Sequence, residues 1–108
     1  MQLKLLNGYP DFVGKRATFC GYGNGPASYS QTTGDVLQFP LTNWYIDAVL
    51  GSVETPTGTY FVRARPAGVG ARRAWGLYWY NTADGTPVSN GTNLSAQQIQ
   101  IGGLCGQY

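Results

Sequence analysis

The chain has 108 residues, of which seven are lysine or arginine, five are aspartate or glutamate and none is histidine. Charged residues make up 11% of the sequence, against about 25% in an ordinary soluble domain, and aromatic residues make up 14%. The missing histidine removes the commonest general acid–base group and metal ligand, and a net charge of +2 is too small to favour nucleic-acid binding by itself. The composition therefore favours a binding or assembly protein over an enzyme.

The length predicts one domain, residues 1–108, that can bury a core without metal or disulfide support. No apolar run approaches the roughly 18–20 residues of a membrane helix, so no membrane partner is expected. The opening MQLKLLNGYPDF lacks the apolar stretch of a signal peptide. We therefore expect a protein that stays where it is made, or leaves the cell by another route such as lysis.

Both chain ends have the sequence of extended arms. Residues 1–12 are interrupted by Pro10, and residues 102–108 (GGLCGQY) are loosened by glycine. Leu3, Leu5 and Leu6 would be wasted on a solvated tail, so we expect the N-terminal arm to lie on a neighbouring molecule or to pair with its sheet edge.

Turn signals recur along the chain at the spacing expected of an all-β protein, with Thr57-Gly58 and Asp84-Gly85 among the clearest. Between them, residues 16–22 and 44–50 are β-branched and aromatic runs typical of strands. This pattern predicts a small antiparallel β-sandwich or a flattened barrel.

Residues 59–65 and 74–82 are predicted to form a hairpin with a long loop, because Pro66 cannot donate to a strand ladder. Both strands carry apolar or aromatic residues on both faces, so we expect the second face to be covered by another sheet or subunit. One face combines Tyr60, Val62 and Ala64 with Trp75, Leu77 and Trp79, and the other combines Phe61, Arg63 and Arg65 with Tyr78 and Tyr80.

A short strand is predicted at residues 86–89, after the Asp84-Gly85 turn. Residues 95–101 are ambiguous, because Ser95 and Gln98 match a capping box whereas residues 98–101 alternate like a strand. We expect a strand at 97–101, since four residues are too few to hold a helix against that alternation.

Cys20 and Cys105 lie near opposite ends of the chain, and each is followed by glycine. They are interpreted as free thiols, with a disulfide between the two ends of the chain as the alternative. Such a bond would close a long loop and contribute about 4–5 kcal/mol in the loop-entropy model. A zinc site is not expected, because the chain has only two cysteines and no histidine.

The sequence contains no catalytic, cofactor-binding or metal-binding motif that we assign. No serine or cysteine has a histidine to activate it, and GYGNG at residues 21–25 lacks a complete dinucleotide fingerprint. Asp35, Glu54 and Asp84 lie in or beside turns, where a capping or solvating role is expected. We therefore predict a protein that is not an enzyme.

Four arginines form the strongest candidate for a partner-binding site: Arg63 and Arg65 share a strand face, and Arg72 and Arg73 lie across the loop. With Tyr78 and Tyr80 they would form a basic, aromatic patch. The patch is either a solvated strand face or a docking site for an acidic protein surface, because arginine and tyrosine are enriched at interfaces. Nucleic acid is a weaker alternative, given the small net charge.

A sugar-binding platform is the alternative function. Carbohydrate-binding proteins stack aromatic rings on sugar faces, and Trp44, Tyr45 and Trp79 are the candidates here. The competing interpretation is that these rings pack in the core or between subunits. We prefer that interpretation for a sheet protein of this size.

The stretches ATFCGYGNGPASYSQTTGD, NWYIDAVLGS and TGTYFVRARPAG resemble small structural proteins encoded near the capsid genes of tailed bacteriophages. The resemblance is one of style, glycine-rich, aromatic and charge-poor, over most of the chain, and includes no short diagnostic motif. It implies a decoration or cement protein on the virion capsid surface, assembled in the host cytoplasm. Such proteins are commonly homotrimers that clamp neighbouring copies of the major capsid protein.

Cementing a phage head has a physical rationale independent of the resemblance. A shell must resist the pressure of packed DNA, and a small protein that bridges capsomers adds interface area at many repeated sites. Small β domains also act as adaptors in tails and baseplates, so these placements stay open as alternatives.

Overall fold

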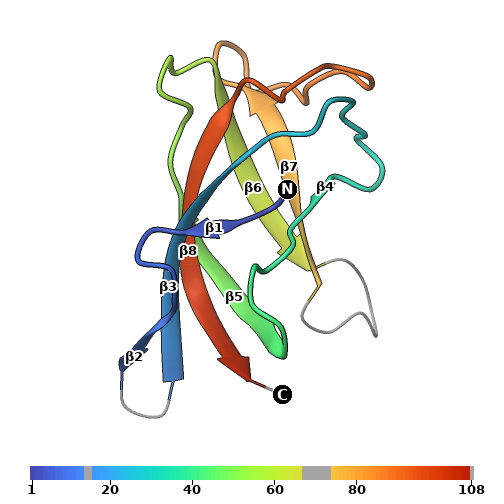
Figure 1. The fold of residues 1–108 in the computed structure, drawn as a ribbon. Helices are drawn as coiled ribbons and strands as arrows, with labels where there is room; N and C mark the ends of the chain where they lie inside the picture. Colours follow the sequence, from blue (N-terminus) through green and yellow to red (C-terminus); the bar gives the residue numbers. More distant parts are fainter. Residues whose placement is uncertain (14–15, 67–73, 108) are drawn as a thin grey trace.

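In a computed structural model, which describes residues 1–13, 16–66 and 74–107, the chain forms two antiparallel sheets (Figure 1). The larger sheet has five strands in the order β1-β3-β8-β5, with β2 also paired to β3, and the smaller has three in the order β4-β7-β6. The sheets do not close into a barrel, so the predicted all-β sandwich is confirmed. The strands are β1 Lys4–Leu5, β2 Asp11–Val13, β3 Arg16–Asn24, β4 Asp35–Val36, β5 Trp44–Ser52, β6 Tyr60–Pro66, β7 Trp75–Asn81 and β8 Gln98–Gln107.

The strands predicted at 16–22, 44–50, 59–65 and 74–82 are confirmed as β3, β5, β6 and β7. The last two form the predicted hairpin, in register from Tyr60 opposite Asn81 to Pro66 opposite Trp75, and the loop between them lies outside the described residues. The strand predicted at 86–89 is reduced to an isolated bridge between Tyr80 and Pro87. The expected turns at Gly58 and Gly85 are confirmed by φ angles of 70° and 73°.

β8 is the central strand of the larger sheet, since it pairs with both β3 and β5. The strand predicted at 97–101 is therefore confirmed, but the expectation of a loose tail is wrong for residues 102–107. The physical reason is close packing: a Cβ atom on Gly103 would clash with the Ala48 carbonyl oxygen. Glycine here admits a neighbouring backbone and does not loosen the chain.

The expectation of an extended N-terminal arm is also wrong, because β1 and β2 both pair with β3. Leu3 is fully buried between the sheets, its N–H donates to the Gln38 carbonyl at 3.0 Å, and the Gln38 N–H donates to the Met1 carbonyl at 2.9 Å. Leu3 thus fills the protein's own core and not a neighbour's surface.

The core lies between the two sheets and follows the predicted alternation. Val62, Leu77 and Trp79 of the smaller sheet are buried, and they face Phe19 and Ile101 of the larger one. In Figure 1 the larger sheet, with β3 and β8, lies in front of the fainter β6 and β7. Among residues 1–13, 16–66 and 74–107, no further sheet covers the outer face of the β6–β7 hairpin.

Candidate functional site

The outer face of the β6–β7 hairpin brings together four of the predicted partner-binding residues. Arg63 and Arg65 are exposed, and Tyr78 and Tyr80 are half-buried beside them. The register places Arg63 directly opposite Tyr78, and the alternation of β6 puts both arginines on the same face. We call this set, together with Phe61, the arginine–aromatic face.

Rings and guanidinium groups of this face are stacked on one another. Phe61 and Tyr80 lie with centroids 5.3 Å apart and an interplanar angle of 17°. The Arg63 guanidinium lies 5.7 Å from the centroid of Tyr80, and that of Arg65 lies 4.8 Å from the centroid of Tyr78. Arg65 also donates to the Tyr80 hydroxyl at 3.2 Å. These cation–π contacts hold two long side chains in defined positions.

The positive charge of this face is not neutralised by the part of the chain that the structure describes. Within residues 1–13, 16–66 and 74–107, no carboxylate forms an ion pair with Arg63 or Arg65. An arginine stacked on a ring keeps its planar N–H donors available at the edges, where a carboxylate can accept two of them. Arg72 and Arg73, the other two predicted members, lie outside the described residues.

The three leucines predicted to bind a partner have different surroundings. Leu3 has no exposed surface, and Leu5 is half-buried against the core, so the prediction is wrong for Leu3. Leu6 is 52% exposed and is the member that a partner can reach.

The sugar platform is not assembled. Trp79 has no exposed surface, so it cannot stack on a sugar, and including it was wrong. Trp44 is half-buried on β5, where it stacks on Phe39 with centroids 6.3 Å apart and lies 6.0 Å from Phe12. Tyr45 follows Trp44 on the same strand and is half-buried as well.

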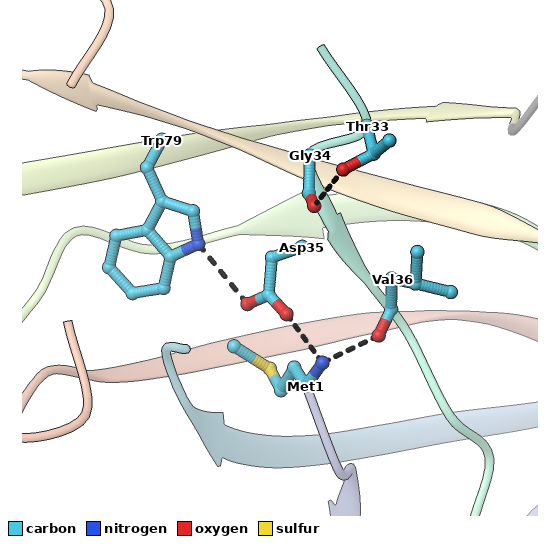
Figure 2. Close-up of polar contacts among 6 residues, drawn as sticks. All are labelled: Met1, Thr33, Gly34, Asp35, Val36 and Trp79. Atoms are coloured by element: carbon cyan, nitrogen blue, oxygen red, sulfur yellow. Dashed lines mark hydrogen bonds and ion pairs between the residues drawn. The ribbon is translucent and has the colours of Figure 1, made fainter. Parts of the chain in front are cut away.

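A buried carboxylate is the main feature that the sequence interpretation missed (Figure 2). One oxygen of Asp35 accepts from the Met1 α-ammonium at 2.5 Å, and the other accepts from the Trp79 indole N–H at 3.3 Å. The Met1 ammonium also donates to the Val36 carbonyl at 2.5 Å. The expected turn role of Asp35 is therefore wrong.

An amine beside a carboxylate can form an acid–base pair, but the carboxylate of this pair is buried and Met1 is half-buried. Both groups are also occupied by hydrogen bonds within the chain. The arrangement joins the start of the chain to β4 and β7. The signal for it was Trp79, since a buried indole N–H requires an acceptor.

The other acids agree better with expectation. Asp84 accepts from the Thr86 hydroxyl at 2.7 Å and from the Thr86 N–H at 3.1 Å, and these bonds lower the pKa of the Asp84 carboxyl. Its predicted capping role is confirmed. Glu54 is exposed just beyond the end of β5.

The two cysteines lie on opposite faces of the larger sheet, and both are free thiols. Cys20 is exposed beside an apolar hollow of about 430 Å³, whose lining includes Leu50 and Gly102. Cys105 is buried on the inner face, where desolvation and, to a smaller extent, the charge of Asp47 raise its pKa to about 11. The disulfide alternative fails because such a bond would have to pass through the sheet.

The described residues contain no group of three or more His, Cys, Asp or Glu side chains that could hold a metal ion. No helix in this part of the chain is long and apolar enough to span a membrane. Comparison with protein-family models, with curated proteins and with solved structures finds no match to this chain.

Proposed function

We propose that this chain is a non-enzymatic assembly protein whose arginine–aromatic face docks on an acidic protein surface. The observation that carries the proposal is the pair Arg63 and Arg65, stacked on tyrosine and phenylalanine rings with no carboxylate of the described chain to neutralise them. Stacking reduces the side-chain entropy that binding would otherwise cost. Arginine and tyrosine are also among the residues enriched at the energetic centres of interfaces.

An acidic protein suits this face better than a nucleic acid. Binding to a phosphate backbone depends on many cations, whereas the whole chain has a net charge of +2. A protein interface needs aromatic anchors with a few charges, and this face offers that composition.

More specifically, we propose that the chain is a capsid cement protein of a tailed bacteriophage. It would bind the major capsid protein at capsomer junctions as a homotrimer. The low charge and the exposed apolar side chains support it, because such surfaces are stable when covered by other subunits. Among the residues that the structure describes, the exposed large apolar side chains are Leu6, Tyr9, Phe12, Val36, Leu50 and Val53.

The first test is the solution mass of the purified chain, measured by light scattering on a sizing column. A trimer is the expected result. A monomer at all concentrations, together with no binding to heads, would overturn the cement proposal. Heads from a phage that encodes this chain, prepared with its gene deleted, provide the binding target in a co-sedimentation assay.

The arginine–aromatic face is tested in the same assay by single substitutions. Arg65→Ala should weaken head binding, and Arg65→Lys should recover only part of it, since lysine keeps the charge but not the planar stack. Lys4→Ala removes one exposed positive charge from β1 and is the matched control. Equal loss from Arg65→Ala and Lys4→Ala would mean that net charge, and not this face, controls binding.

A further inference from the structure

The two sheets end at strands that are consecutive in the chain. β5 is the last strand of the larger sheet and β6 the last of the smaller one, so an open seam runs between them. The pairing of β5 with β8 shifts register after Ile46 and again after Val49, which marks two irregularities along this edge strand. A hollow of about 230 Å³ lies in the seam, lined by residues 49–52 of β5 and 62–64 of β6.

The backbone of β6 presents hydrogen-bonding groups to this seam. The Tyr60 N–H donates to the Thr55 hydroxyl at 3.2 Å, and the Tyr60 carbonyl accepts from the Thr55 N–H at 3.0 Å. Strand alternation directs the N–H and C=O groups of Val62 and Ala64 to the same side. The Val62 carbonyl accepts from the Ser52 hydroxyl at 3.1 Å, which agrees with this assignment.

No strand in the described part of the chain pairs with this edge of β6. An edge of this kind is a template for one more strand. Pro66 limits the template at its end, because its nitrogen has no hydrogen to donate.

The side chains along β6 define the chemistry of an incoming strand. On the inner side its residues would lie beside the buried Val62 and the half-buried Ala64, which favours apolar side chains. On the outer side its residues would lie directly opposite Arg63 and Arg65, where opposite charges stabilise a pair and like charges destabilise it. A single strand can meet both requirements, because its side chains point alternately to the two faces, so apolar and acidic residues can alternate along it.

We propose that the β5–β6 seam binds one extended segment of the partner protein, with acidic residues facing Arg63 and Arg65 and apolar residues at the alternate positions. The segment hydrogen-bonds to the open edge of β6 and extends the smaller sheet to four strands. This inference depends on the proposed function, because it specifies how the partner is held.

The test uses a synthetic eight-residue peptide of alternating glutamate and valine with blocked ends. We expect it to bind and to slow amide hydrogen exchange at Val62 and Ala64, whose N–H groups would become hydrogen-bonded. A peptide of the same composition with paired glutamates and paired valines, and one of alternating lysine and valine, should bind more weakly. Arg63→Ala and Arg65→Ala should each weaken binding about two- to fivefold, and Lys4→Ala should not.

Equal binding of the alternating and the paired peptide would overturn the proposal, as would unchanged exchange at Val62 and Ala64 with peptide bound. If amide exchange at Val62 and Ala64 is already slow without peptide, and becomes slower as the concentration of the chain rises, a second copy of the chain occupies the seam. That result would overturn the assignment of the seam to a partner protein. If the chain binds phage heads with exchange at the seam unchanged, the seam proposal fails and the proposed function stands. If the peptide binds as expected but heads do not, the proposed function fails instead.

Discussion

Asp35 on β4 accepts the indole N–H of Trp79 on β7 at 3.3 Å, with both side chains buried. Replacing Asp35 with alanine leaves the indole and the Met1 ammonium without their acceptor. We expect Asp35→Ala to lower the free energy of unfolding by about 3–5 kcal/mol, measured by urea denaturation. Asp35→Asn keeps a carbonyl oxygen for the indole and should cost less. Asp84→Ala, at an exposed turn, is the control, and an equal loss there would contradict a special role for Asp35.

Gly103 and Gly51 provide a matched pair in the larger sheet. A Cβ atom at Gly103 would meet the Ala48 carbonyl oxygen, whereas one at Gly51 has nothing within 4 Å. Gly103→Ala should therefore destabilise the protein by about 1–3 kcal/mol, the usual cost of overpacking. Gly51→Ala should be neutral or slightly stabilising, since it restricts the unfolded chain. Similar melting temperatures for the two variants would contradict the close approach of β5 and β8.

The two thiols should react at very different rates. At pH 8 a maleimide should modify Cys20 quickly and Cys105 only when the protein is denatured, because Cys105 is buried and its pKa is about 11. Mass spectrometry before and after denaturation measures this as one adduct and then two. Two adducts on the native protein would contradict the placement of Cys105.

Stability should also fall at alkaline pH. The folded pKa of Cys105 is raised from 9.0 to about 11, so the folded state retains a proton that the unfolded state loses. This contribution is fully present below pH 9 and is lost as the pH rises from 9 to 11. Burial also raises the pKa of Tyr29, which adds a loss of the same sign above pH 10. Cys105→Ala should remove the loss of stability that comes from the thiol. If the stability of this variant has the same pH profile as that of the wild type, Cys105 is not the cause of the loss.

Trp79 and Trp44 should contribute differently to the stability of the protein. Trp79→Ala removes a fully buried side chain and should cost about 3–5 kcal/mol, whereas Trp44→Ala removes a half-buried one and should cost less. Urea denaturation compares the two variants. Glycan binding that is lost in a folded Trp44→Ala variant would favour the sugar-binding alternative over the assembly proposal.

The long strands were predictable because their information is local. Alternation and flanking turn residues specify β3, β5, β6 and β7, and the period of two along β6 is enough to assign Arg63 and Arg65 to one face of the strand. The arginine–aromatic face follows from that alternation, since the hairpin register then places Tyr78 opposite Arg63.

The features that were missed depend on contacts between distant residues. Trp79 and Met1, the partners of Asp35, lie 44 and 34 positions away along the chain, so no local pattern marks Asp35 as buried. The glycine-rich sequence at the end of β8 resembles that of a flexible tail. Only the close approach of Ala48 on β5 shows that these glycines are needed within a sheet. The burial of Leu3 depends on the space between the two sheets, and the sequence around Leu3 does not specify that space.

The central position of β8 has a consequence for synthesis on the ribosome. Asn24 of β3 pairs with Gln98 of β8, so β3 emerges long before its main partner is made. At about 5–20 residues per second, this interval lasts roughly 4–15 seconds. During that time the apolar faces of β3 and β5 have no strand between them, and nascent chains on one messenger RNA are close together. Chaperone demand should therefore be greatest before translation is complete, and slower decoding of the β8 codons should lower the yield of folded protein.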